Sequence, residues 1–193
     1  MFSGVFVCLF TAWVSAKQVM KFDIILFNEK IGELTVTRDL KPDGSELFVL
    51  SSSSRAKILW IDRENDSYYE YLYKNGRLLS SSYKEKERGK LVRWGTTKIV
   101  GNNYVSENYS GKTVLKEVPV YTVPSIYFHD FTKMQRMYYD AEAEFVPVEH
   151  PDSQTITYKT SDGHRNVYHY VNGQLHHLEV HVSFASVKMV RVE

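Results

Sequence analysis

The chain has 193 residues, of which 43% are hydrophobic and 24% are charged. This length fits one domain, and the balance of apolar and charged residues is that of a folded protein rather than a disordered one. Lys and Arg number 24 against 23 acidic residues, so the formal net charge is only +1. Because a protein that neutralises many phosphates needs a concentrated basic excess, the composition argues against nucleic-acid binding.

The N-terminus carries an apolar run, Phe2 to Val14, followed by the small residues Ser15 and Ala16. The run is too short to cross about 30 Å of hydrocarbon as a helix, and it is typical of a secretory signal cleaved after Ala16. No Lys or Arg precedes the run, although signal peptides usually have one there. The alternative to a signal peptide is that this run forms a buried first strand or helix. The sequence thus predicts a signal peptide over 1–16 and one exported domain over 17–193, with at most peripheral membrane contact. The only cysteine, Cys8, would leave with the signal, so the mature chain could form no disulfide or thiolate metal site.

The chain after Met20 has the composition and punctuation of β-structure. Aromatic residues make up 14% of the sequence, with 14 Tyr and 10 Phe, and such side chains suit a pleated, half-buried surface. Turns rich in Gly, Asn and Pro separate the apolar runs. The expected strands include Phe22–Phe27, Ile31–Arg38, Glu46–Ile61, Leu91–Val100, Tyr104–Tyr109 and Thr113–Val118, with a last meander over Thr155–Val192.

Two hairpins share the pattern Y-x-Y-x-N-G-x-L, one over Tyr71–Leu78 and one over Tyr168–Leu175. Asn-Gly between alternating runs is a strong hairpin signal, because a type I′ turn needs positive φ at both central residues. Two explanations stay open for the repetition: convergence on good hairpin chemistry, or duplication of a β-meander. One short helix is expected over Val123–Thr132, where Pro124 suits the first turn. The predicted class is all-β with about ten strands and one short helix.

The C-terminal hairpin holds the candidate metal ligands. A regular register around Asn172-Gly173 pairs His169 with His176. The same register sets His164 opposite His181. Imidazoles on adjacent strands with a carboxylate suit zinc or copper. The four residues of this weak candidate site are His164, His177, Glu179 and His181. The alternative is a solvated strand face, and this is the interpretation that the sequence favours, with no metal and no cofactor.

Acid–base and nucleophilic chemistry find little support. One group of acidic residues lies in an expected turn: Asp62, Glu64 and Asp66. A second group alternates on an expected strand, as on a solvent-exposed face, and consists of Asp140, Glu142 and Glu144. The sequence contains no G-x-S-x-G elbow and no Gly-rich phosphate loop. We therefore expect no catalytic residues and no enzyme.

Several segments, taken in order, resemble a family of uncharacterised exported β-proteins of Gram-negative bacteria, a domain of unknown function. They are the N-terminal signal, Ile31–Arg38, Tyr71–Leu78, Pro119–Phe128 and Asp162–Gly173. The resemblance spans the mature chain and implies a curved, partly open antiparallel sheet, similar to the spiral β-roll and to periplasmic half-barrels. It also implies a periplasmic or outer-envelope location. The family supplies no catalytic residues to carry over.

Three functions are compatible with these observations. The first is a non-enzymatic envelope protein whose curved sheet binds an apolar, lipid-like ligand, since concave aromatic-lined surfaces hold such molecules. The second is an assembly module that binds another envelope protein through a sheet edge. The third is a metal-binding protein that uses the His-rich hairpin. The sequence does not indicate an oligomeric state.

The export prediction is tested by the N-terminus of the mature protein. We expect N-terminal sequencing or intact mass to show a chain that begins at Lys17, because signal peptidase cuts after small residues such as Ala16. Recovery of chains with intact Met1 from the cytosol would contradict it.

Overall fold

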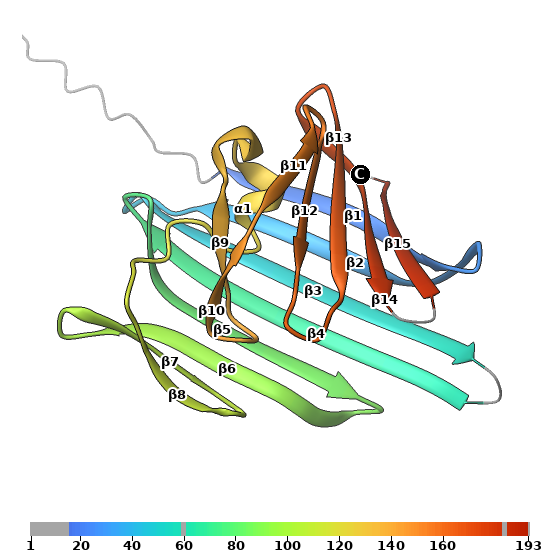
Figure 1. Ribbon diagram of the computed structural model, residues 1–193, viewed down its shortest axis with the longest axis horizontal. Helices are drawn as coiled ribbons and strands as arrows, with labels where there is room; N and C mark the ends of the chain where they lie inside the picture. Colours follow the sequence, from blue (N-terminus) through green and yellow to red (C-terminus); the bar gives the residue numbers. More distant parts are fainter. Residues whose placement is uncertain (1–15, 59–60, 183–184, 193) are drawn as a thin grey trace, which may run out of the picture.

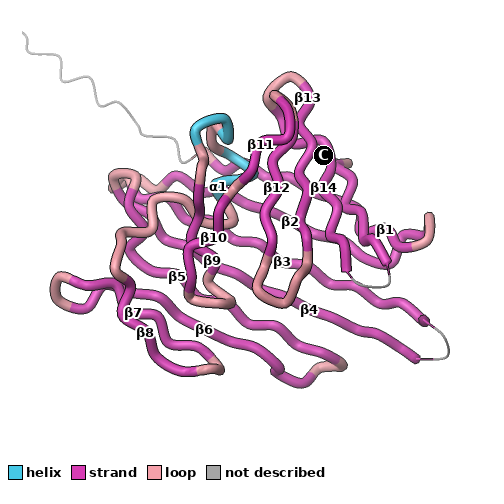
Figure 2. The backbone as a smooth tube through the Cα atoms, viewed as in Figure 1, coloured by secondary structure: helices cyan, strands magenta, loops and turns pink. Residues whose placement is uncertain are grey.

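The computed structural model describes residues 16–58, 61–182 and 185–192. The predicted signal segment, apart from Ala16, lies outside these residues, and so does Cys8. Within them most of the chain is antiparallel strand (Figure 2). The strands are β1 (Lys17–Leu26), β2 (Glu29–Leu40), β3 (Ser45–Ile58), β4 (Ile61–Lys74), β5 (Arg77–Glu87), β6 (Lys90–Val100), β7 (Asn103–Asn108), β8 (Gly111–Leu115), β9 (Arg136–Tyr139), β10 (Glu144–Pro147), β11 (Glu149–Asp152), β12 (Thr155–Lys159), β13 (Arg165–Val171), β14 (Gln174–Val182) and β15 (Ala185–Arg191).

Thirteen of these strands form one sheet, in the order β11-β12-β13-β14-β15-β1-β2-β3-β4-β5-β6-β7-β8. The sheet consists of two meanders, β1–β8 and β11–β15, joined where β1 pairs with β15. It curls so that β12 and β13 lie in front of β2–β4 (Figure 1). Its edges, β8 and β11, do not pair with each other, so the sheet stays open. The predicted all-β, curved antiparallel sheet is confirmed.

The concave face of the sheet is covered by the chain's own residues 121–148, which we call the inner segment. It contains one helical turn, α1 (Ser125–Phe128), a 3-10 turn at Phe131–Lys133, and the separate β9–β10 hairpin. Ile126, Met134 and Tyr138 are fully buried against the sheet. The inner segment contacts both meanders, since the ring of Tyr127 lies 5.8 Å from that of Phe22 in β1 and Phe131 stacks on Tyr170 in β13 at 3.7 Å.

Strand alternation follows the predicted pattern, with one set of side chains facing the core and the other facing outward. In β1 the buried set is Phe22, Ile24 and Leu26, and in β2 it is Leu34 and Val36. The strand count is higher than the ten expected, in part because β9, β10 and β11 have only four residues each, too few for alternation to show.

Local structure differs from expectation at three places. The helix expected over Val123–Thr132 is reduced to α1 and the 3-10 turn, because His129 is extended and ends the helix. The acidic group at 62–66 lies in β4 rather than in a turn. In the group at 140–144, Asp140 and Glu142 lie in the turn between β9 and β10 rather than in a strand, and Glu144 is the first residue of β10. No helix in the described part of the chain is long and apolar enough to cross a bilayer.

Both Asn-Gly hairpins form the predicted type I′ turn. The angle φ is 53° at Asn75 and 70° at Gly76, and it is 51° at Asn172 and 75° at Gly173. Positive φ at both central residues matches the right-handed twist of the flanking strands. In each hairpin the register then shifts by one residue, after the second pair from the turn. The extra residue is Leu79 in the first hairpin and His176 in the second.

The shared pattern of the two hairpins is a core pattern. Its Tyr and Leu residues are all at most 3% exposed: Tyr71, Tyr73, Leu78, Tyr168, Tyr170 and Leu175. The hydroxyl of the second Tyr of each hairpin also forms a hydrogen bond with the inner segment. The Tyr73 hydroxyl lies 2.7 Å from Thr122 Oγ1, and Tyr170 donates to the Ile126 carbonyl at 2.7 Å. The inner segment is therefore held from both meanders by equivalent groups.

Asp140 at the tip of the β9–β10 hairpin is only 3% exposed, so the expectation of a wet strand face is wrong for this residue. It accepts a hydrogen bond from Ser81 in β5. Its Oδ2 atom and the hydroxyl of Tyr71 are buried without a hydrogen-bond partner among the described residues. Burial raises the pKa of Asp140 to about 6, against the opposing effect of the hydrogen bond from Ser81. The carboxylate therefore destabilises the fold once it ionises.

The first test of the fold is Gly173→Val. At φ 75° a branched side chain is strained, while a Cβ added there meets no atom within 4 Å, so the cost is purely conformational. We expect a loss of about 1–3 kcal/mol in the free energy of unfolding, measured by urea denaturation. Gly173→Asn is the matched control, because Asn tolerates positive φ. Equal stability of the two variants would show that the turn geometry does not matter.

The second test concerns Asp140→Asn. Since the folded-state pKa lies above the ordinary 3.8, the protonated side chain stabilises the fold fully below about pH 4, and this stabilisation is lost as pH rises through about 6. We expect the variant to be more stable than the parent at pH 7.5, by on the order of 1–3 kcal/mol, and similar to it at pH 4. Thermal melting across this pH range measures the effect, with the exposed Asp62→Asn as control. A variant that loses stability at pH 7.5 would contradict the assignment.

Candidate functional site

The interior of the curved sheet retains a cavity of about 150 Å³, which we call the lumen. Strands β2–β4 form one wall, β12–β15 form the other, and the inner segment closes the space between them. Most lining side chains are aliphatic or aromatic. The lining residues are Leu34, Leu50, Ser52, Ser67, Tyr69, Val123, Tyr127, Tyr139, Tyr158, Asn166, Tyr168, Leu178, Val180 and Met189.

The tyrosines of the lumen remain uncharged at neutral pH. Burial raises the pKa of Tyr127, Tyr158 and Tyr168 well above the ordinary value of 10. Burial also raises the pKa of Tyr69, and so does Glu85, which accepts a hydrogen bond from its hydroxyl. The lumen therefore presents apolar carbon and neutral phenol groups, a lining that suits an apolar ligand.

A larger cavity of about 880 Å³, with a mixed polar and apolar lining, lies at the end of the sheet that carries the Asn172-Gly173 turn. Ionic and amide groups contribute to its lining, among them Arg38, Asp130 and Arg191. Arg38 forms an ion pair with Glu46 at 2.6 Å, and Arg191 donates to Gln174. Because such groups are well solvated by water, we take the lumen rather than this cavity as the candidate site for an apolar ligand.

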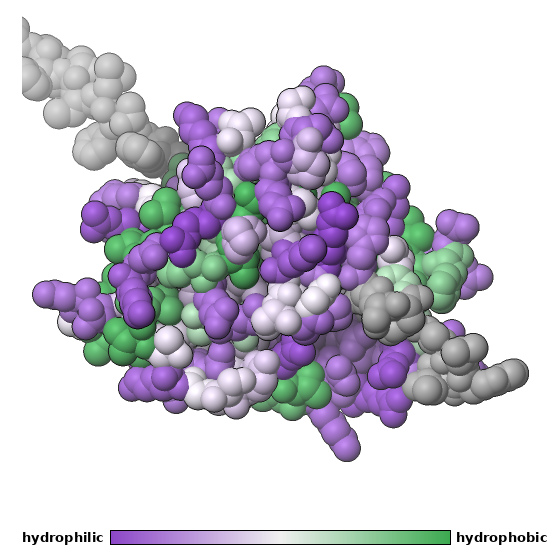
Figure 3. Space-filling view, in the orientation of Figure 1, coloured by the Kyte–Doolittle hydropathy of each residue, from purple (hydrophilic) through white to green (hydrophobic). Residues whose placement is uncertain are grey.

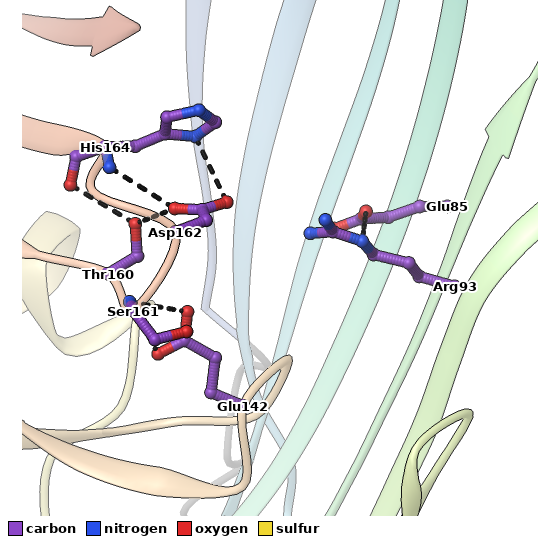
Figure 4. Close-up of polar contacts among 7 residues, drawn as sticks. All are labelled: Glu85, Arg93, Glu142, Thr160, Ser161, Asp162 and His164. Atoms are coloured by element: carbon purple, nitrogen blue, oxygen red, sulfur yellow. Dashed lines mark hydrogen bonds and ion pairs between the residues drawn. The ribbon is translucent and has the colours of Figure 1, made fainter. Parts of the chain in front are cut away.

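Two groups of polar contacts involve charged residues, one at the turn after β12 and one on β5 and β6 (Figure 4). In the turn after β12, Asp162 accepts from Thr160 Oγ1 at 2.5 Å and lies 3.4 Å from the ring of His164. Glu142 accepts from the Ser161 N–H at 2.9 Å. Glu85 of β5 and Arg93 of β6 lie 4.0 Å apart. Partial burial on its own would lower the pKa of Arg93. The negative charge of Glu85, and more weakly that of Asp162, has the larger effect, so the pKa of Arg93 is raised.

The structure separates one of the four predicted metal ligands, His164, from the other three. His164 belongs to the Asp162 turn, outside β13, and the residue opposite His181 is Arg165. The expected pairing of His169 with His176 is also wrong, because the bulge in β14 sets His169 opposite His177. His177, Glu179 and His181 do share a face, as expected from alternation. Sequence reasoning missed His169, because no residue pattern distinguishes a bulged hairpin from a regular one.

The environment of His177 changes its protonation. Burial lowers its pKa to about 4, and the nearby Lys188 and His169 contribute in the same direction. Glu179 opposes the change. The His177 ring is therefore neutral at physiological pH.

The two edges of the sheet differ in their surfaces. Edge strand β11 is fully exposed and includes Pro151 among charged residues, which discourages pairing with another strand. At the other edge, hydrophobic side chains gather over β6–β8, toward the left in Figure 3. Exposed ones there include Val100, at 51% exposure, and Val114 of β8, at 57%.

The fold resembles a crystal structure described as a β-barrel-like protein of the domain of unknown function DUF1849 from Brucella abortus. The two structures superpose with a TM-score of 0.57 at 13% sequence identity, over 91% of this chain and 95% of that chain. This likeness supports the fold alone. A search of curated proteins gave no match.

A family model also matches the sequence. It is described as domain of unknown function DUF6134, and its match covers residues 22–192, nearly the whole of the described fold. This agrees with the resemblance seen in the sequence to a family of unknown function. The chain therefore belongs to the DUF6134 family.

Proposed function

We propose that this protein is a non-enzymatic protein of the bacterial periplasm or outer envelope that holds an apolar, lipid-like group in its lumen. The observation that carries the proposal is the composition of the lumen walls, where the sheet and the inner segment present aliphatic side chains and neutral phenols to one cavity. Burial of apolar ligand surface against such walls contributes roughly 25 cal/mol per Å². The N-terminal apolar run supports the location.

The cavity volume limits what the lumen holds. An apolar cavity of roughly 150 Å³ accepts a group of about the size of benzene. The lumen therefore fits a ring or a short alkyl segment, and a longer lipid would place the rest of its chain outside. Ser52, Ser67 and Asn166 supply polar groups among the lining residues that could orient a head group.

The acidic groups that suggested acid–base chemistry have other roles, which supports the non-enzymatic part of the proposal. Asp140 is buried at the hairpin tip with Ser81. Glu142 fixes the backbone N–H of Ser161. Glu64 forms an exposed ion pair with Arg55.

A second candidate function, docking of another envelope protein on a sheet edge, is favoured by the contrast between the two edges. Strand β8 is an edge with an exposed Val114 and no proline, whereas β11 has the residues that usually protect an edge. Native mass spectrometry of protein purified from its own envelope, with lipid extraction, separates the two functions. A bound lipid supports the first, and a bound protein supports the second.

The lumen itself is tested by filling it. Val180 is a partly buried lining residue, and Val180→Trp should occupy the space that a ligand would use. We expect N-phenyl-1-naphthylamine, an apolar fluorescent probe, to insert one ring into the lumen of the parent protein. It should bind Val180→Trp at least about tenfold more weakly, since loss of one buried ring's contacts is worth more than 1.4 kcal/mol. Fluorescence titration measures both.

Val114→Trp is the matched control, because it adds the same side chain to an exposed strand position. It should bind the probe like the parent. Equal binding by all three proteins, or no binding by the parent, would overturn the lumen proposal, provided that far-UV circular dichroism shows the variants folded.

A further inference from the structure

The outer face of the β13–β14 hairpin, on the opposite side of the sheet from the lumen, gathers His169, His177 and Glu179. One ligand atom from each of the three lies within 4.8 Å of the other two. The rings of His169 and His177 are stacked, with centroids 4.3 Å apart and planes inclined by 17°. All three side chains are partly buried, so their positions are constrained by neighbours.

The bulge in β14 creates this grouping. It inserts His176 as an extra residue and so brings His177 opposite His169. His177 and Glu179 are two residues apart and therefore share a face of the strand. The inserted His176 also stays beside the cluster, with its Nδ1 atom 3.0 Å from Nδ1 of His177. In a regular hairpin His169 would face His176 instead. His176 and Glu179 are three residues apart, so this pair and Glu179 would lie on opposite faces of the sheet.

Neighbouring polar groups orient the cluster. Thr155 Oγ1 lies 3.4 Å from Nδ1 of His169. His181 lies 3.5 Å from Glu179 Oε2, and its other ring nitrogen lies 2.7 Å from Ser186 Oγ. Such second partners fix ring orientation and carboxylate position in metal sites.

One cation competes for the carboxylate. Lys188 Nζ lies 3.8 Å from Glu179 Oε1. The Lys188 side chain is 44% exposed, so its ammonium can move into solvent when another cation takes its place. A divalent ion at the centre of the cluster would attract the carboxylate more strongly than a single exposed ammonium does.

We propose that His169, His177 and Glu179 bind one divalent transition-metal ion, Zn²⁺ or a similar imidazole-preferring ion. Two imidazoles and one carboxylate form an established donor set for zinc, and the remaining position is open to water or to His176. The site lies outside the lumen, so an ion bound there makes no contact with an apolar ligand.

The experiment is a zinc titration of tag-free protein that has been stripped with EDTA and dialysed. We expect one Zn²⁺ per chain by isothermal titration calorimetry, together with a rise in melting temperature that grows with zinc concentration, because the ion binds only the folded state. His169→Gln combined with His177→Gln should abolish both effects. Glu179→Gln should weaken binding at least about tenfold, and it provides a second test if the double variant does not fold.

His164→Gln is the matched control, since His164 lies beside a carboxylate but outside the cluster. It should bind zinc like the parent protein. No zinc uptake by the parent would overturn the proposal. Uptake that survives in both the double variant and Glu179→Gln, or that His164→Gln removes, would also overturn it.

Discussion

The fold depends on covering the concave face of an open sheet. A curved sheet whose edges do not pair leaves one apolar face without a partner, and a single layer cannot bury that face. Here the chain supplies its own cover, since the inner segment packs Ile126, Met134 and Tyr138 against both meanders. The phenol hydroxyls of Tyr73 and Tyr170 then satisfy backbone and side-chain groups of that segment inside the core. The lumen is the part of the concave face that this cover leaves open.

The features set by local chemistry could be predicted from the sequence. Asn-Gly specifies a type I′ turn through its own φ preferences, and alternation assigns each strand a buried face. The features set by distant packing could not. Asp140 alternates with Glu142 and Glu144 as an exposed strand would, and only its docking beneath β5 buries it. The bulge at His176 changes the partner of His169 without any sign in the residue pattern. The lumen walls likewise come from strands far apart in the chain, so alternation shows which side chains face inward but not which strands face each other.

One hairpin carries both proposed sites. In β13 and β14, Tyr168, Leu178 and Val180 point into the lumen. His169, His177 and Glu179 alternate with them and form the cluster on the other face. The backbone of this hairpin thus forms the wall between an apolar cavity and a polar face. An ion that fixed His169 to His177 would hold the two strands in register, and it would stiffen one wall of the lumen without entering it. Such an effect would act through rigidity rather than through contact.

The position of β1 has a consequence for how the molecule is assembled. β1 pairs with β2, its neighbour in the chain, but its other edge pairs with β15, so Phe22 meets Arg191. The first meander can form from local turns, whereas the joint between the two meanders needs the last strand of the chain. Contacts of such high sequence separation slow folding, because the entropy of closing the loop is lost before the contacts form. Until β15 arrives, the outer edge of β1 is an unpaired strand, and the nascent protein is vulnerable there to association with other chains.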